Sequence, residues 1–357
     1  MTQETNTSLV TRAPFLPGLA LCVGVAVIAV GAIELLDLLD VAMISPVFVA
    51  IAIGLLIGNI ASLPDTLRTG FAFAMKRVLR LAIILLGIGF SLSELWNIGA
   101  PAALAIAVIV IAAFALAVGL SRIVGVDPRV GVLIGAGTAI CGNSAIVATA
   151  PLVDAREEDI AFASATITLF GTVAMLGFPA LALLLDLSAE QVGTLAGLGV
   201  HDSAQSIAAG FLHSITAGEH ATLVKLTRTA FLVPILGVLT VAHLARTRAA
   251  RAASGSPPLG FVGVLKTGIP WFAVGFVVLA AVRTLGDRWL DAAEPWTTIV
   301  SLLRWSATFL IVVAMAAVGL QTRFSALRSM GVKAFSVGLF CSLAVAAIAL
   351  AFSVNAA

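Results

Sequence analysis

The sequence predicts an all-α, polytopic membrane protein, and three observations support this fold class. The chain of 357 residues is 61% hydrophobic and 11% charged, whereas soluble domains carry roughly a quarter charged residues. Apolar runs of about 20 residues, the length that a helix needs to cross a bilayer, recur from end to end. Basic residues gather in alternate loops, which is typical of the cytoplasmic side of a membrane.

About eleven transmembrane helices are expected, joined mostly by short polar loops. Residues 1–16 form a polar cytoplasmic tail, and residues 17–357 form one transmembrane domain. The first span is too evenly apolar for the core of a signal peptide, and no convincing cleavage site follows it. The expected spans are 17–36, 44–62, 72–92, 101–121, 130–152, 160–185, 190–212, 226–245, 268–286, 297–319 and 334–354.

The basic residues give the expected orientation. With a cytoplasmic N-terminus, the inside segments hold fourteen of the 20 Lys and Arg residues, in agreement with the positive-inside rule. The acidic clusters around Glu34, Glu157 and Asp287 then lie outside. The odd number of spans places the C-terminus on the periplasmic side of a bacterial inner membrane.

Internal likeness predicts inverted repeats. Residues 87–99 match residues 319–331 at one constant offset, with two glycines, a serine and a leucine in common. The repeat elements are 72–121 and 297–354. The expected topology makes these two copies run in opposite directions, as in many secondary transporters.

Two segments read as discontinuous, broken helices in a core around residues 130–245. Residues 135–148 (GAGTAICGNSAIVA) and 197–210 (GLGVHDSAQSIAAG) share glycines, an amide side chain and a serine. Irregular backbone at membrane depth is tolerated only where it is buried in protein or lines a cavity. The expected topology makes the two segments parallel, so either one span is re-entrant or the likeness is convergent.

The first broken segment supplies candidate substrate-binding residues, namely Gly137, Thr138, Gly142, Asn143 and Ser144. A helix that restarts here exposes free N–H groups, which with the helix dipole attract an anion. The alternative is packing, because small and hydroxyl residues let membrane helices approach closely.

The second broken segment and the span after it contain ionisable residues. His201 and Asp202 are candidates for coupling or gating, because buried ionisable groups are costly and usually serve a pathway; Gln205 and Ser206 would bind substrate. An interfacial or merely hydrogen-bonded His–Asp pair is the alternative. Lys225 and Arg228 share a helix face and would line an anion site; the alternative is that both extend to the outer interface.

Other classes of protein find little support in the sequence. The three cysteines fall within apolar spans and the four histidines lack metal-ligand spacing, so no cofactor or metal is expected. The net charge is only +2, and the basic residues are scattered over loops rather than gathered on one face, so no nucleic-acid partner is expected. No ordered catalytic motif is present, so an enzyme is not expected.

Several of these runs together resemble a known family. GTAICGNSAIVATAPLV, VHDSAQSIAAG, VKLTR and the earlier KRVLRLAIILL resemble a bacterial inner-membrane family described as sulfate exporters, within the sodium/proton antiporter and bile-acid symporter-like superfamily. The resemblance covers nearly the whole chain. It implies inverted repeats, two crossing broken helices, a scaffold (panel) part, a mobile core and a homodimer. It also places Asp202 where the family carries a proton-binding carboxylate.

These features together predict a secondary transporter that works by alternating access. The expected substrate is a small inorganic or sulfur-containing anion, sulfate first, moved by export, with proton or sodium coupling and membrane lipid as the surroundings. The alternative is a cation/proton antiporter, or a sodium- or proton-coupled organic-anion symporter, on the same fold.

Overall fold

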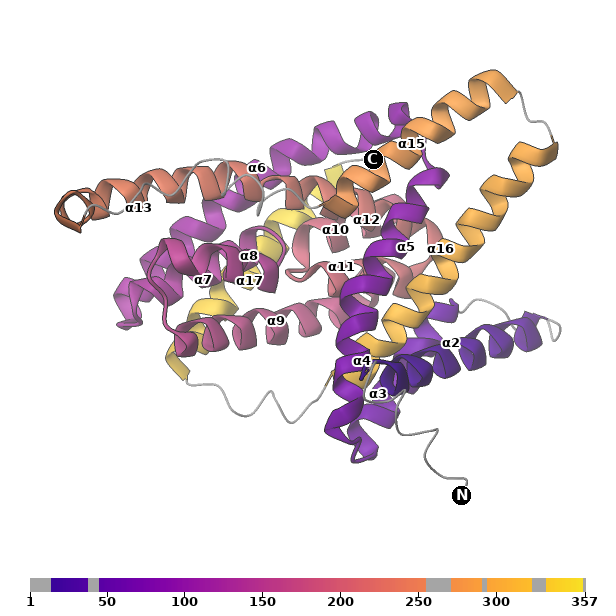
Figure 1. Ribbon diagram of the computed structural model, residues 1–357, viewed down its shortest axis with the longest axis horizontal. Coiled ribbons are helices and arrows are strands. Elements are labelled where there is room, and N and C mark those ends of the chain that lie inside the picture. Colours follow the sequence, from indigo (N-terminus) through magenta and orange to yellow (C-terminus); the bar gives the residue numbers. More distant parts are fainter. Residues whose placement is uncertain (1–13, 38–44, 255–270, 291–293, 323–331, 356–357) are drawn as a thin grey trace. The chain divides into compact units, whose positions relative to one another are not determined.

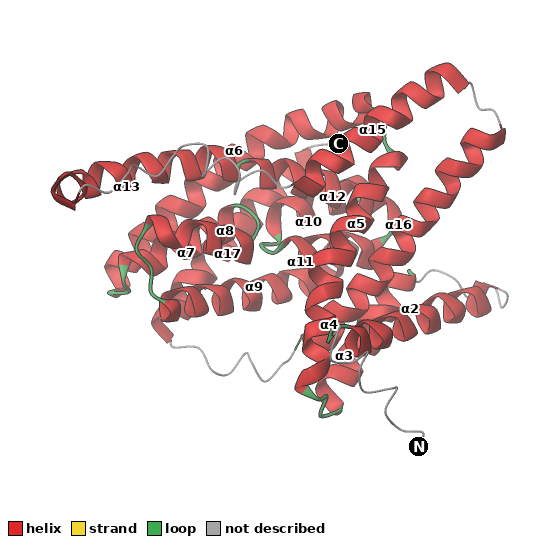
Figure 2. Cartoon of the chain, viewed as in Figure 1, coloured by secondary structure: helices red, strands yellow, loops and turns green. Residues whose placement is uncertain are grey.

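The computed structural model describes residues 14–37, 45–254, 271–290, 294–322 and 332–355, and over these ranges the chain is helical with short turns (Figures 1 and 2). The chain divides into two compact units. Unit 1 comprises residues 1–95 and 272–327, and unit 2 comprises residues 96–271 and 328–357.

Unit 1 is built around the long helix α16 (Glu294–Gln321), against which the helices between residues 16 and 86 pack. Close approach of α3 and α16 depends on glycine: a Cβ at Gly54 would lie 2.7 Å from the Ala316 carbonyl oxygen. The remaining elements are α2 (Leu16–Asp37), α3 (Pro46–Ile60), α4 (Arg68–Phe73), a π-helical turn (Ala74–Val78), α5 (Leu79–Leu86) and α15 (Trp271–Leu290).

Unit 2 combines long helices with four short ones. The long helices are α6 (Leu92–Val124, which begins in unit 1), α9 (Glu157–Leu184), α12 (Ile215–Ala230) with its near-continuation α13 (Leu232–Ser254), and α17 (Val332–Asn355). The short ones are α7 (Pro128–Ala139), α8 (Asn143–Thr149), α10 (Ala189–Gly199) and α11 (Ser203–His213). At 1.5 Å per residue, a helix of 12 residues such as α7 reaches only about 18 Å, or half-way across a bilayer.

Helices α7 and α8 form a hairpin that returns to the side from which it starts. Val130 and Val153 belong to one hydrophobic cluster, together with Ala163 near the start of α9. A straight helix would separate residues 130 and 153 by about 35 Å. The turn at Ile140–Gly142 therefore reverses the chain, and we call α7, this turn and α8 the first hairpin.

Helices α10 and α11 form a second hairpin of the same kind. The Ser206 hydroxyl of α11 donates to the Ala196 carbonyl of α10 across a distance of 2.8 Å. Gly193 and Gly210, on opposite arms, both lie against the Ala217 carbonyl at the start of α12. The chain therefore turns back at Val200–Asp202, and we call α10, this turn and α11 the second hairpin.

The two hairpins approach α9 from its two ends, as Figure 1 shows for α7 and α8 on one half and α10 and α11 on the other. The first packs on the early part of α9 through Ala163 and Ile167. The second packs near its end, where Ala182 meets Val192.

The predicted crossings 130–152 and 190–212 were therefore wrong. Each run is long and apolar enough to cross, but its central turn sends the chain back to the side where it entered.

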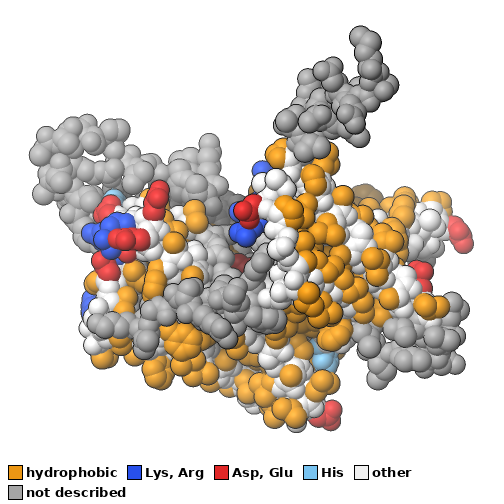
Figure 3. All heavy atoms as spheres, turned by 90° about the horizontal axis from the view of Figure 1, so that it is seen from below, with side chains coloured by type: hydrophobic (Ala, Val, Ile, Leu, Met, Phe, Trp, Pro, Cys, Tyr) orange, Lys and Arg blue, Asp and Glu red, His pale blue; other side chains and the backbone are white. Residues whose placement is uncertain are grey.

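Six helices of the described residues are long and apolar enough to cross a membrane: Leu16–Leu35, Leu92–Val124, Glu157–Leu184, Ile215–His243, Glu294–Gln321 and Phe335–Asn355. Large apolar side chains such as Ile28, Ile111, Leu184 and Val238 are exposed, and Figure 3 shows hydrophobic side chains over much of the visible surface. Such surface suits lipid rather than water. The proposed repeat 319–331 lies mostly outside the described residues, so its comparison with 87–99 stays a prediction.

The hairpin topology makes a prediction about accessibility. Residues 129 and 157, which lie in the first turn of the first hairpin and just after its end, should both be labelled from the same side of the membrane. Arg129→Cys and Glu157→Cys should therefore react with a membrane-impermeant maleimide in vesicles of one orientation, and Glu190→Cys, beyond the far end of α9, only in the other. The native cysteines are buried (Cys22 0%, Cys141 4%, Cys341 0% exposed), so they should give no signal. Labelling of residues 129 and 157 from opposite sides would show that the segment crosses the membrane.

Candidate functional site

The two hairpin turns meet in the middle of unit 2. Gly142 has φ +72° and ψ −129°, a conformation that L-residues with side chains rarely adopt. A Cβ there would lie 2.9 Å from the Asp202 Cα and 3.0 Å from its carboxylate oxygen Oδ2. Only glycine lets the turns approach this closely. We call the region where Ile140–Gly142 and Val200–Asp202 meet the tip junction.

Arg228, from α12, ties the first arms of both hairpins together. Its Nε donates to the Ala139 carbonyl (2.8 Å) and its Nη1 to the Leu198 (2.6 Å) and Val200 (3.0 Å) carbonyls. Its Nη2 donates to the Thr138 carbonyl. These carbonyls end α7 and α10, where they lack helical partners and carry partial negative charge. The guanidinium, which is 0% exposed, satisfies them from one point.

Lys225 serves the second hairpin in the same way. Its Nζ donates to the Val200 (2.8 Å) and His201 (2.6 Å) carbonyls, and the side chain is 1% exposed. Both predicted cations therefore lie at the tip junction, but they hold backbone carbonyls and do not extend to an interface.

Asp202 satisfies the opposite ends of the broken helices. Its Oδ1 accepts from the Ala204 N–H at 2.9 Å, as the N-cap of α11. The carboxylate also interacts with the N–H groups of Gln205 and, across the junction, Asn143. N–H groups at a helix start bind anions, and here the anion that they bind is the protein's own carboxylate.

Two threonines of α9 complete the polar lining beneath the tips. The Gln205 amide nitrogen donates to the Thr172 hydroxyl (2.8 Å) and the Thr168 carbonyl (3.2 Å). The Asn143 amide nitrogen lies 3.4 Å from the Thr168 hydroxyl. Sequence reasoning missed both threonines, although two hydroxyls four positions apart on one face of an apolar helix are a detectable signal.

His201 contacts α17 and not Asp202. Its Nε2 lies 2.7 Å from the Ser342 hydroxyl, and the ring is 1% exposed. Ser342 was also missed, and one serine in an apolar span gives no signal that could have found it. Among the described residues, the buried atoms without a hydrogen-bond partner include four at or next to the tip junction: Thr138 Oγ1, Asn143 Oδ1, His201 Nδ1 and Gln205 Oε1. Buried polar atoms without a partner are uncommon in folded proteins and call for an explanation.

Three predicted binding residues have other surroundings. Ser144 is exposed at the start of α8. Ser206 is 0% exposed and its hydroxyl is engaged within the second hairpin. Gly137 lies in a packing contact, because a Cβ there would come 2.8 Å from the Ile167 side chain. The junction thus brings together Thr138, Gly142, Asn143, His201, Asp202, Gln205, Lys225 and Arg228.

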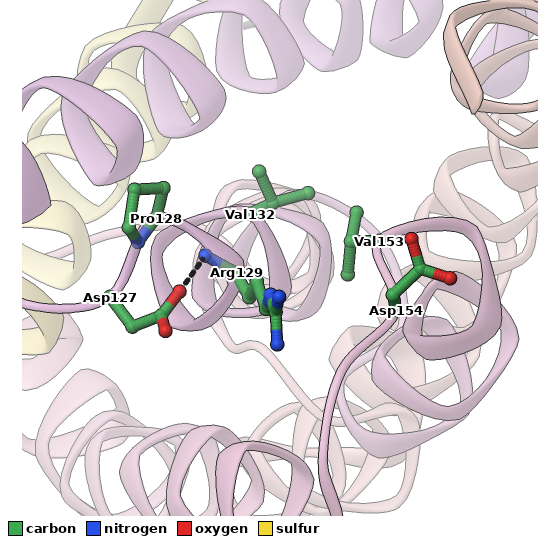
Figure 4. Close-up of a pocket in the computed structure, with 6 residues that line it drawn as sticks. All are labelled: Asp127, Pro128, Arg129, Val132, Val153 and Asp154. Atoms are coloured by element: carbon green, nitrogen blue, oxygen red, sulfur yellow. Dashed lines mark hydrogen bonds between the residues drawn. The ribbon is translucent and has the colours of Figure 1, made fainter. Parts of the chain in front are cut away.

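A separate pocket of about 400 Å³ opens where the first hairpin begins and ends (Figure 4). It is lined by Asp127, Pro128, Arg129, Val132, Val153 and Asp154. The Asp127 carboxylate caps α7 by accepting from the Arg129 N–H at 2.8 Å. Because the lining comes from both ends of the hairpin, the pocket again shows that residues 129 and 154 lie on one side.

Comparison with known proteins decides the family. A family model described as "conserved hypothetical protein 698" matches residues 17–338. The chain belongs to this family. A UPF0324 membrane protein of Bradyrhizobium diazoefficiens is 33% identical over 331 residues, which cover 91% of this chain and 88% of that protein. Another, from Streptococcus agalactiae serotype V, is 32% identical over 340 residues, which cover 94% and 96%.

The match to the conserved hypothetical protein 698 family includes both hairpins, Lys225 and Arg228. A further relative, the UPF0324 membrane protein of Agrobacterium fabrum, is 34% identical over 327 residues, 91% of this chain and 89% of its own. The chain is thus a multi-pass membrane protein, in agreement with its apolar helices. No solved structure matches it.

Proposed function

We propose that this protein is a secondary transporter of a small oxyanion, with sulfate as the first candidate. The observation that carries the proposal is the charge at the tip junction. Two buried cations, Lys225 and Arg228, lie there with one carboxylate, Asp202. The junction thus holds two basic side chains against one carboxylate, and an anion would compensate the excess positive charge at low cost in a buried place.

The helix ends at the junction would select the position of the anion. The carbonyl ends of α7 and α10 are taken by Arg228 and Lys225. At the start of α11 the Ala204 N–H donates to the Asp202 side chain, which also interacts with the N–H groups of Gln205 and Asn143. An oxyanion would bind these N–H groups, and the Asn143 and Gln205 side chains would lie beside it.

The remaining parts of the proposal follow from the topology. Because α7 and α10 start from opposite ends of α9, the two hairpins would be an inverted pair, each opening to one side in alternating access. Unit 2 would be the mobile core and unit 1 the scaffold. With the first hairpin re-entrant, Arg156 joins the basic residues on the proposed cytoplasmic side of a bacterial inner membrane, which strengthens the inside bias. The acidic cluster around Glu157, expected outside, would lie on the cytoplasmic side with it.

Export needs no ATPase domain. Moving negative charge outward across an inside-negative membrane releases about 2.3 kcal/mol per charge per 100 mV. A cation/proton antiporter is the second candidate, because Asp202 offers a carboxylate at the junction. It would have to bind its cation next to Lys225, which interacts electrostatically with that carboxylate.

Flux measurements separate the two candidates. In proteoliposomes with an imposed potential, we expect saturable uptake of labelled sulfate and no sodium-dependent proton movement. Asn143→Ala should lower sulfate flux about tenfold or more while leaving the melting temperature nearly unchanged, since the residue is only half-buried. Asn355→Ala, at the end of α17, is the matched control and should transport normally. Sodium/proton exchange without sulfate flux would contradict the anion proposal.

A further inference from the structure

The Asp202 carboxylate occupies the place that the proposed function gives to substrate. Its Oδ1 accepts from the Ala204 N–H at 2.9 Å, and the group also interacts with the Gln205 and Asn143 N–H groups. A backbone N–H has one hydrogen to donate. An oxyanion that binds these groups must therefore displace the carboxylate, so the two anions exclude each other.

The neighbours of Asp202 decide what happens to the displaced carboxylate. Lys225 from α12 and the Cys141 thiol from the first hairpin interact with it electrostatically, and His201 precedes it in the chain. Lys225 is already engaged by the Val200 and His201 carbonyls. On α9 and α17 the nearest polar groups around the junction are hydroxyls, Thr168, Thr172 and Ser342. Arg228 donates to carbonyls of both hairpins. A displaced carboxylate thus loses its backbone donors and is left with at most the third N–H of Lys225.

We propose that the transported anion and the Asp202 carboxylate alternate at these N–H groups, and that each anion bound leaves Asp202 protonated. This inference rests on the proposed function and adds its coupling ion. The step is balanced: one proton from the solvent bonds to a carboxylate oxygen of Asp202, and no other covalent bond changes. A carboxylic acid that has lost its N–H donors costs less to bury than a carboxylate.

The same exchange keeps the N–H groups hydrogen-bonded when no substrate is present. Without substrate, Asp202 bridges the two hairpins, since it caps α11 and reaches the Asn143 N–H of the first hairpin. The protein thus carries its own substitute anion, and the N–H groups are satisfied in both states. A proton would then accompany each anion across the membrane, and proton and anion binding would be thermodynamically linked.

Calorimetric titration of the full-length protein in detergent with sodium sulfate tests whether Asp202 takes up a proton when the anion binds. Sulfate stays dianionic between pH 6 and 8, so any proton taken up belongs to the protein. Titrations in buffers of different ionisation enthalpy should give about one proton taken up per sulfate, with Kd rising about tenfold per pH unit. In Asp202→Asn, sulfate should bind with no proton uptake and a Kd that does not vary with pH. The exposed Asp186→Asn, where asparagine suits the φ of +51°, should behave like the wild type.

The outcomes distinguish this inference from the proposed function. Sulfate binding by the wild type without proton uptake would overturn the inference and leave the anion transporter standing. Proton uptake that persists in Asp202→Asn would also overturn it, and would assign the proton to another group. Failure of sulfate to bind at any pH would overturn the proposed function and the inference with it. The wild-type proton count decides the question even where Asp202→Asn does not fold.

Discussion

Replacing Arg228 with alanine is expected to destabilise the protein by about 4 kcal/mol, which should lower the melting temperature by about 10 °C. The side chain is 0% exposed and donates to the carbonyls of Thr138, Ala139, Leu198 and Val200. Alanine would leave these helix-end carbonyls buried without partners, and each such loss costs about 1–3 kcal/mol. Because the carbonyls belong to both hairpins, the tip junction should open as a unit.

Thermal unfolding in detergent, followed by tryptophan fluorescence, checks this prediction. Arg228→Lys keeps the charge but loses the planar fork that reaches both hairpins, so it should fall between the wild type and Arg228→Ala. Arg129→Ala is the matched control, because Arg129 is exposed in the first turn of α7, and its effect should stay within about 0.5 kcal/mol. If Arg228→Ala melts like the wild type, Arg228 does not hold the hairpins together.

Gly142→Ala is expected to have the second large effect, a destabilisation of about 3 kcal/mol with loss of sulfate binding. Two costs add at this residue. Its φ of +72° disfavours any side chain, and the new Cβ would lie 2.9 Å from the Asp202 Cα. The contact is with backbone of the opposite hairpin, so relief requires the two tips to separate. Separation would also remove Asp202 from the Asn143 N–H.

Two other glycines separate the backbone cost of a positive φ from the cost of the contact between the two tips. Gly125 has a similar φ of +73° but open space around its Cβ position, so Gly125→Ala should cost only the backbone term, about 1 kcal/mol. Gly177, inside α9, also has open space, and Gly177→Ala should be neutral or slightly stabilising. Melting temperatures and sulfate affinities of the three variants give the comparison. Equal losses in Gly142→Ala and Gly125→Ala would show that the contact between the tips contributes little.

Much of the candidate site could be predicted from residue type alone. Gly142, Asn143, His201, Asp202, Lys225 and Arg228 are conspicuous because polar groups and glycines are costly in apolar segments. What these residues do there was harder to predict. Lys225 and Arg228 were expected to face a substrate, but they bind carbonyls at the ends of α7 and α10. Those carbonyls need hydrogen-bond donors from a side chain only because both hairpins turn back at the same buried place.

The sequence by itself determined the class of protein, the approximate place of its long helices and the position of both helix breaks. The starts of two helices were misplaced, since α6 begins at Leu92 rather than 101 and the candidate span around α12 begins at Ile215 rather than 226. Hydropathy is a property of each segment, and a long apolar run has to form a helix in a bilayer whatever its neighbours are. The tertiary structure alone decided that the runs at 130–152 and 190–212 turn back rather than cross. An apolar run long enough to cross has the same composition as a re-entrant hairpin. The difference lies in the contacts between its arms, in the close approach of Gly142 to Asp202, and in one arginine that satisfies both hairpins at once.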